Sequence, residues 1–362
     1  MHSLAGTLAA PFPYFGGKAL ACEAVWAAFG EVENYVEPFA GSAAMLLGAP
    51  DGKRVETIND ADGFVANFWR AVAADADAVA DHADWPTNET DLFARHSWLV
   101  RQRADMLDRL HADPGWFDAK VAGWWCWGAC NWIGSGWCSG DGPWVHDGER
   151  LVDNRKLPHL GDAGQGINRK LPHLSNGRGI NRKLPHLGDA GRGINRQLPH
   201  LGDAGQGRAT DLPRGEFIRE WFAALKARMR DVRVACGDWR RVLSDSVTIR
   251  HGTTAVFLDP PYTRGAMDYA AGGVGGAVAG DVRAWCAQNG SQIALRIVLC
   301  GHAGEHDSLL QHGWTTRAWT ARKGYAVTAE AVENSASETI WCSPSCLATV
   351  PVIADLFAES VA

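Results

Sequence analysis

No hydrophobic run in this 362-residue chain approaches the roughly 20 residues that a membrane-spanning helix needs. The N-terminal segment also lacks the charged stretch followed by a long apolar stretch that is typical of a secretion signal. Glycine is frequent, with 41 copies, but no three-residue period appears, which excludes a collagen-like chain. The nine cysteines are odd in number and irregularly spaced, so we expect a reduced intracellular protein rather than a disulfide scaffold.

An excess of basic residues is also missing, since 35 lysines and arginines face 41 aspartates and glutamates, a net charge of −6. This balance argues weakly against a protein that coats nucleic acid. The charge is unevenly distributed, however. Residues 153–208 contain ten basic and four acidic residues, a net +6, which leaves −12 for the rest of the chain.

Most of this basic segment consists of four near-copies of one unit, NRKLPHLGDAGQGI, in residues 154–207. The period of 13 or 14 residues and the few apolar positions are too small for a unit with its own core. We expect either a basic arm that binds DNA phosphates or a loop expansion without function, and the pattern favours neither. Candidate phosphate contacts in the first two copies are Arg155, Lys156, Arg169 and Lys170.

Outside the repeats, short apolar strands alternate with helical patterns, which predicts a mainly parallel α/β sheet with ligands at the carboxyl ends of its strands. The expected strands are 35–40, 54–59, 232–235, 255–258, 293–300 and 338–342. The expected helices are 18–29, 62–80, about 90–112 and about 214–230.

The sharpest motif is Asp259-Pro260-Pro261-Tyr262, directly after the apolar strand at 255–258. Two prolines end a strand abruptly, because they lack an N–H and have a fixed φ. The Asp259 carboxylate and the Pro260 carbonyl can accept both hydrogens of the exocyclic amine of a nucleobase, while Tyr262 stacks on the base. A proline-braced turn without function is the simpler alternative.

Two further segments have the small residues and charges of a ligand site. Residues 35–45 run from a strand into the turn Glu37-Pro38-Phe39-Ala40-Gly41, and a second strand ends near Asp60, where an acid could bind ribose hydroxyls or simply cap the next helix. Residues 11–18, PFPYFGGK, place two glycines and Lys18 before the first helix, without the spacing of a Walker A loop.

Taken in order, the segments FPYFGGK, VEPFAG, NDAD, CGDW and DPPY resemble the Dam-like family of DNA adenine-N6 methyltransferases. The resemblance covers roughly residues 11–80 and 214–345. It implies a Rossmann-like fold, S-adenosylmethionine as the methyl donor, double-stranded DNA as the partner and a bacterial or bacteriophage-infected cytoplasm. It divides the chain into a cofactor part (1–85), a partly helical target-recognition region (86–213) and a catalytic part (214–362).

The resemblance also implies roles for individual residues. Asp259, Pro260, Pro261 and Tyr262 would hold a flipped adenine. The cofactor would be bound by the N-terminal segment, the turn after the first strand and two aspartates; these residues are Tyr14, Phe15, Gly17, Lys18, Glu37, Phe39, Gly41, Asp60 and Asp238. No metal is expected.

The middle region departs from the family pattern. The family has an Asn- and Arg-containing segment here, whereas this chain has Asn131 without a nearby arginine. Six tryptophans lie between Trp124 and Trp144; most fit a small core, and we expect Trp137, among glycines, to be the exposed ring that contacts DNA. Three cysteines and His146 nearby do not have the spacing of a common zinc site.

Three alternatives stay open at this point. The Asp-Pro-Pro-Tyr motif does not exclude N4 of cytosine as the target. A relative that binds DNA without turnover, or an enzyme acting on RNA or a free nucleoside, would have a similar sequence. The recognition sequence, the biological role and the oligomeric state are not determined by these patterns, and a monomer is compatible with them.

Overall fold

The computed structural model describes residues 8–13, 18, 21–132, 136–138, 144–146, 151–153, 214–262, 275–318 and 338–347. Within these ranges the N-terminal half contains α1 (Cys22–Phe29), β1 (Asn34–Glu37), α2 (Ala44–Leu47), β2 (Val55–Asp60), α3 (Gly63–Ala83), α4 (Glu89–Ala112), α5 (Ala119–Asn131), β3 (Trp144–His146) and β4 (Leu151–Asp153). The C-terminal half contains α7 (Arg214–Met229), β5 (Val232–Cys236), η5 (Trp239–Val242), η6 (Ile249–His251), β6 (Thr254–Leu258), α8 (Gly275–Asn289), β7 (Leu295–His302), η7 (Asp307–His312), β8 (Thr315–Ala318) and β9 (Glu338–Cys342).

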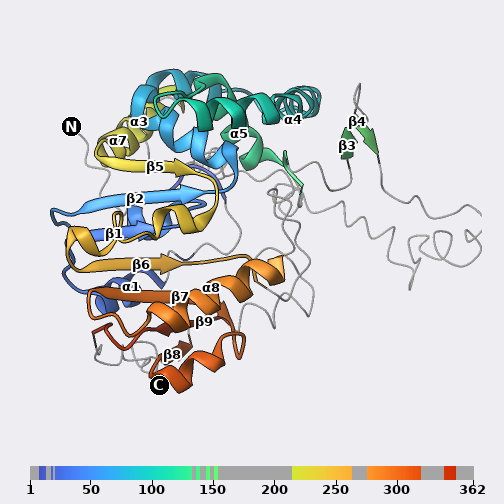
Figure 1. The fold of residues 1–362 in the computed structure, drawn as a ribbon. Helices are drawn as coiled ribbons and strands as arrows, with labels where there is room; N and C mark the ends of the chain where they lie inside the picture. The colour runs from blue at the N-terminus through green and yellow to red at the C-terminus, as the bar shows by residue number, and fades with distance from the viewer. Residues whose placement is uncertain are drawn as a thin grey trace, which may run out of the picture.

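Seven strands form one sheet in the order β5-β2-β1-β6-β7-β9-β8 (Figure 1). The five strands from β5 to β7 are parallel, and β9 runs antiparallel between β7 and β8. The chain steps outward from β1 in both directions, so the order reverses between β1 and β6. This is the doubly wound arrangement of a Rossmann-like fold, and the fold predicted from the sequence is confirmed.

Helices cover both faces of the sheet, and alternate residues of each strand point to opposite faces. On one face Tyr35, Ile58 and Phe257 belong to the core shared with α1, α3, α5 and α7. On the other face Val36, Val256 and Leu258 pack with η5, α8 and η7. Figure 1 shows α3, α5 and α7 grouped near the β5 side of the sheet.

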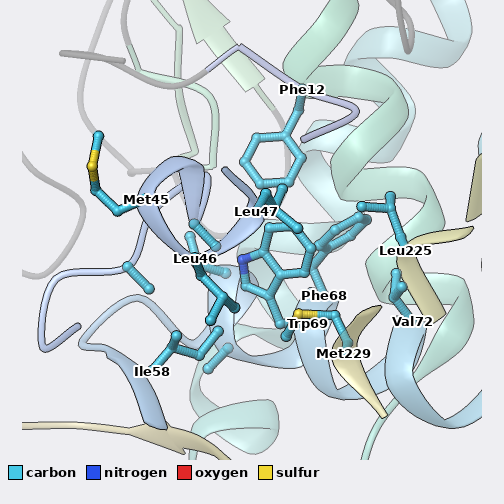
Figure 2. Packing of buried hydrophobic residues seen from close by; sticks show 14 of the residues in the cluster. Phe12, Met45, Leu46, Leu47, Ile58, Phe68, Trp69, Val72, Leu225 and Met229 are labelled. Atoms are coloured by element: carbon cyan, nitrogen blue, oxygen red, sulfur yellow. The ribbon is translucent and has the colours of Figure 1, made fainter. Parts of the chain in front are cut away.

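The core centres on Trp69 of α3, which is fully buried. Phe68 meets it edge to face at 5.0 Å, and Phe12 of the N-terminal segment meets Phe68 in the same way at 5.0 Å (Figure 2). The N-terminal segment is also held by hydrogen bonds from Trp221 to the Ala9 carbonyl and from Cys130 to the Pro11 carbonyl. These contacts hold residues 9–12 against the core.

The predicted strands and helices all occur, with shifted ends. The strand expected at 35–40 ends at Glu37, because Pro38 lacks an N–H and Gly41 has φ of +46°. The helix expected at 18–29 begins at Cys22. The sequence patterns did not predict α5, α8, β8 or the β3–β4 pair. No described helix is long and apolar enough to cross a membrane.

Candidate active site

Residues far apart in the sequence meet at one edge of the sheet. The parallel strands β1, β2, β5, β6 and β7 all end there, and the antiparallel β9 begins there. The residues that these strand ends present are Glu37, Asp60, Asp259 and Glu338. A doubly wound sheet binds its ligands outside this edge, next to the point where the strand order reverses.

The turn after β6 holds the Asp-Pro-Pro-Tyr motif. All five residues of β6 are buried, and the strand ends at Leu258. The Tyr262 hydroxyl donates a hydrogen bond of 3.0 Å to Oδ1 of Asp259. The Lys18 ammonium lies 3.4 Å from the same oxygen. The structure therefore brings together Lys18, which the sequence analysis assigned to the cofactor, with Asp259 and Tyr262, which it assigned to the target base.

Lys18 is the central cation of this edge. Only 3% of its side chain is exposed, and its Nζ lies 3.2 Å from Oε2 of Glu338 as well as close to Asp259. The Nζ also lies 5.0 Å from the centre of the Tyr262 ring. Burial lowers the pKa of Lys18, but the charges of Asp259 and Glu338 outweigh burial and leave the pKa above its ordinary value. Lys18 is therefore charged at neutral pH.

Burial and the charge of Lys18 have opposing effects on the pKa of the two carboxyl groups beside it. Burial raises the pKa of Asp259, while Lys18 and the Tyr262 hydroxyl lower it in part. Burial likewise raises the pKa of Glu338, and Lys18 opposes that rise. Two acids share one ammonium, so the ionised cluster has an excess of negative charge.

The turn after β1 is held by side chains from neighbouring elements. The backbone N–H of Gly41 donates 2.8 Å to Oδ2 of Asp60, and the Trp69 indole donates 3.0 Å to the Gly41 carbonyl. Gly41 and Ala43 both have positive φ, +46° and +50°, which produces a tight turn before α2. The backbone of this turn lies directly at the ligand edge of the sheet.

Asp60 is at the end of β2 and accepts two backbone hydrogen bonds of 2.8 Å, from Gly41 and Asp62. Burial raises its pKa to about 7, with a further contribution from the charge of Asp62. The capping role considered for Asp60 belongs to Asp62, whose Oδ1 accepts from the N–H of Phe64 in the first turn of α3. Asp60 instead fixes the turn after β1.

Asn59 joins two ligand-facing turns. Its Nδ2 donates 3.0 Å hydrogen bonds to the Pro38 carbonyl after β1 and to the Gly237 carbonyl after β5. The side chain is only 1% exposed. The segment NDAD stands out in the sequence, but this bridging role does not, because it depends on β2 lying between β1 and β5.

Glu37 ends β1 beneath the site. Its Oε2 accepts 2.9 Å from the hydroxyl of the fully buried Tyr35, two residues earlier on the same face of the strand. Burial raises the pKa of Glu37 to about 8, against the effect of the Tyr35 hydrogen bond. Glu37 therefore carries a proton over much of the neutral range.

The remaining predicted cofactor residues lie on the β5 side. Phe39 is half-buried, with its ring 6.0 Å from that of Trp239. Asp238 caps η5 through the N–H of Arg240, and its side chain is 54% exposed. Arg240 also reaches Asp281 of α8 at 2.6 Å. Asp238 thus lies at the rim of the site rather than inside it.

The structure does not support a DNA contact by Asn131 or an exposed Trp137. Asn131 is 2% exposed, accepts from Thr87 and donates to the Trp127 carbonyl, so its amide serves the fold. Trp137 is half-buried, and its indole donates 3.0 Å to the Trp125 carbonyl. The expectation of an exposed ring was wrong, because Gly128 of α5 leaves a gap that the Trp137 ring fills.

Several predicted residues lie outside the described part of the chain: Tyr14, Phe15, Gly17, Arg155, Lys156, Arg169 and Lys170. The zinc hypothesis for the middle region also depends partly on undescribed side chains. Among the described residues, no group of three or more histidines, cysteines, aspartates or glutamates could hold a metal ion.

Sequence reasoning missed two residues of the site, Glu338 and His302. They face each other at the end of the β7–β9 ladder, and the His302 ring meets Tyr262 edge to face at 4.7 Å. A glutamate at the start of an apolar strand was visible in the sequence. The predicted parallel sheet placed that strand start at the opposite edge, and only the antiparallel direction of β9 brings Glu338 to Lys18.

Comparison with known protein families supports the motif-based resemblance. Residues 14–107 match the family described as D12 class N6 adenine-specific DNA methyltransferase. The resemblance to adenine-N6 DNA methyltransferases is confirmed. The matched stretch includes Lys18, Glu37, Phe39, Gly41 and Asp60 of the site. No curated protein matches the chain.

Proposed function

We propose that the chain transfers a methyl group from S-adenosylmethionine to N6 of an adenine that is flipped out of double-stranded DNA. The observation that carries this proposal is the arrangement of Lys18, Asp259 and Tyr262 at the end of β6. The match to an adenine-N6 methyltransferase family supports the choice of adenine.

The residues present fit S-adenosylmethionine. Asp259 and Glu338 against one Lys18 leave an excess of negative charge, which suits a positively charged sulfur. The tight turn at Gly41 allows a ligand to approach the backbone closely. Asp60 would accept from ribose hydroxyls, and Asp238 at the rim would accept from the cofactor's adenine amine. Glu37, Phe39 and Gly41 would form the floor of the site.

The target base would be held by the turn after β6. The contacts that described residues make with the Asp259 carboxylate, from Lys18 and Tyr262, both use Oδ1. Oδ2 is then the oxygen that would accept from the exocyclic amine of adenine, with the Pro260 carbonyl accepting its second hydrogen. Pro261 fixes the turn between that carbonyl and Tyr262.

When bound, S-adenosylmethionine supplies a methyl group on a positively charged sulfur. Asp259 and the Pro260 carbonyl would draw the lone pair of N6 away from the purine ring by accepting both N–H hydrogens. The Tyr262 ring would stack on the base, while Lys18 and His302 hold that ring in place. No covalent intermediate with the protein is needed, because the amine itself is the nucleophile.

DNA binding would involve parts of the chain on either side of this edge. In this proposal residues 1–85 bind the cofactor, residues 86–213 recognise the target and residues 214–362 form the catalytic part. The basic repeats would add a salt-sensitive contact with phosphates. The described helices α4 and α5 of that segment pack against α3, which leads directly from Asp62 at the ligand edge.

Replacement of Asp259 tests the proposal. We expect Asp259→Ala and the isosteric Asp259→Asn to lower methyl transfer to DNA at least about 100-fold, because both remove the carboxylate that accepts from the amine. Cofactor binding by calorimetry should persist in both variants. Glu33→Gln, which removes an acid near the start of β1 at the opposite edge, is the matched control. Transfer at the wild-type rate by Asp259→Asn would contradict the proposed role.

A further inference from the structure

We infer that Glu338 is a positioning residue, which holds Lys18 between two carboxylates and so keeps Asp259 available to the target amine. The inference rests on the proposed function and concerns a residue outside the recognised motifs. It starts from three observations: the 3.2 Å contact between Glu338 and Lys18, the 3.4 Å contact between Lys18 and Asp259, and the burial of Lys18 and Glu338 beside the half-buried Asp259.

The geometry makes Lys18 a shared ion. Its Nζ lies 3.4 Å from the Asp259 carboxylate and 3.2 Å from the Glu338 carboxylate. Only 3% of the Lys18 side chain is exposed, so water contributes little to its solvation. A buried ammonium with a single carboxylate forms a closed pair whose charges cancel. With a second carboxylate on its other side, Lys18 neutralises neither acid fully. Asp259 is then held less tightly by Lys18, and its carboxylate stays available to accept a hydrogen bond from an amine.

Glu338 is well placed for this task because the sheet fixes it. It is the first residue of β9 and lies opposite His302, the last residue of β7. The ladder between β7 and β9 continues for five residue pairs, from His302 and Glu338 to Val298 and Cys342. A side chain on such a support has little freedom to follow Lys18 if Lys18 moves toward Asp259.

The groups around Asp259 set the sign of the expected pH effect. Lys18 acts on it from the N-terminal segment, Glu37 from β1, Tyr262 from its own turn, Cys300 from β7 and Glu338 from β9. His302 of β7 acts on Glu338 and contacts the Tyr262 ring. Of these, Glu338 is the nearest further acid to Lys18. Without its charge, Lys18 would stabilise the ionised form of Asp259 more strongly, and the pKa of Asp259 would fall.

The test compares Glu338→Gln, Glu338→Asp and, as the control at the opposite edge, Glu31→Gln. We expect Glu338→Gln to lower kcat about tenfold, equivalent to about 1.4 kcal/mol, with a smaller change in the KM for either substrate. The acidic limb of its pH–rate profile should move to lower pH. Glu338→Asp, which keeps the charge on a shorter side chain, should recover part of kcat.

A second measurement does not depend on methyl transfer. Removing the charge of Glu338 should lower the pKa of Lys18 and raise the fraction of neutral amine. Labelling by an amine-reactive ester at fixed pH, followed by peptide mass spectrometry, should then modify Lys18 at least about threefold faster in Glu338→Gln than in the wild type or Glu31→Gln. The ratio to an exposed lysine of the same molecule, Lys53, corrects for reagent activity.

The two measurements separate two kinds of failure. If the wild type methylates no DNA while Lys18 labelling still responds to Glu338→Gln, the proposed function fails and the coupling of Glu338 to Lys18 stands. If the wild type is active but Glu338→Gln has wild-type kcat, pH limb and Lys18 labelling, the inference is wrong. A loss of kcat with no movement of the pH limb and no change in labelling would also overturn it, since that pattern indicates a structural role.

Discussion

At the residue scale, the site is organised by buried charges whose partners come from different elements. Lys18 reaches Asp259 after β6 and Glu338 on β9, and Asp60 on β2 holds the backbone of Gly41. These side chains are buried or half-buried, so each charge depends on a specific neighbour. A single substitution here should therefore change activity or stability in a way that follows from the contact it removes.

Asn59 provides a stability test of the connection between two turns. We expect Asn59→Ala to lower the free energy of unfolding by about 2 kcal/mol, because the Pro38 and Gly237 carbonyls lose their shared donor. Urea unfolding followed by circular dichroism measures this change. It should also weaken cofactor binding, since both turns face the ligand edge.

Thr57 on the same strand is the matched control. Its buried Oγ1 has no hydrogen-bond partner in the part of the chain that the structure describes. Thr57→Val should then be neutral or slightly stabilising, because it removes an unsatisfied polar atom without changing the shape. Equal destabilisation by Asn59→Ala and Thr57→Val would show that the bridge contributes nothing specific.

His306 should make the protein less stable in acid. It follows β7, is fully buried and meets Trp341 edge to face at 5.0 Å. Burial lowers its pKa to about 4, although the charge of Glu305 opposes this. The unfolded chain takes up a proton near pH 6.5 and the folded protein only near pH 4, so stability falls as the pH drops through this window.

The measurement compares unfolding free energies at pH 7.5 and pH 5. The wild type should lose about 2 kcal/mol more than His306→Gln, which keeps a polar side chain that does not titrate. The same loss in both proteins would mean that other groups cause the acid sensitivity.

At the scale of elements, the sequence predicted every central strand and the main helices that flank them. The regular spacing of Phe64, Val65, Phe68 and Trp69 is enough to indicate α3. Helix α5 was not predicted, because its sequence, AKVAGWWCWGACN, is apolar on nearly all sides and its apolar residues have no helical period. Helix α8 begins with two glycines and contains a third, which disfavour a helix locally.

Part of the site was not predicted from the sequence, for a related reason. The motifs located Lys18 because two glycines precede it, Asp259 because two prolines follow it, and Asp60 because it ends an apolar strand pattern. Glu338 has no such signal beside it, and its place depends on the antiparallel pairing of β9 with β7. The burial of Trp137 depends on a gap at Gly128 that no local pattern reveals.

The close packing of α3 and α5 can be tested at Gly123. A Cβ at this position would lie 2.4 Å from Cβ of His82 and 2.7 Å from the Val79 carbonyl, so the two helices would have to separate. We expect Gly123→Ala to destabilise the protein by about 2 kcal/mol or more. Thermal unfolding measures the change.

Gly280 in α8 is the control, because a Cβ there would meet nothing within 4 Å. Gly280→Ala should stabilise the protein by about 0.5–1 kcal/mol, the usual gain from replacing glycine inside a helix. If both alanine variants had the same effect, the contact between α3 and α5 would not be what requires glycine at residue 123.

At the scale of the whole molecule, the modest net charge of −6 averages two unlike parts. The repeats and their borders, residues 153–208, have +6, and the remainder has −12. An acidic body that is proposed to act on DNA needs positive charge to meet the phosphates, and residues 153–208 supply a net +6.

Deleting residues 168–207 tests whether the repeats contribute to DNA binding. If they act as a basic arm, the deletion should weaken binding most at low salt and reduce the slope of log affinity against log salt. Fluorescence anisotropy with one DNA duplex across a salt series measures both quantities. An unchanged affinity and slope would identify the repeats as a loop expansion without a role in binding.

The central claim is methyl transfer to N6 of adenine, and the identity of the methylated nucleoside tests it most directly. The protein is incubated with S-adenosylmethionine labelled in its methyl group and unmethylated duplex DNA, and the DNA is digested to nucleosides for mass spectrometry. The account predicts label in N6-methyladenine, and in no nucleoside when Asp259→Ala replaces the wild type. Label in N4-methylcytosine, or bound cofactor with no labelled base, would contradict it.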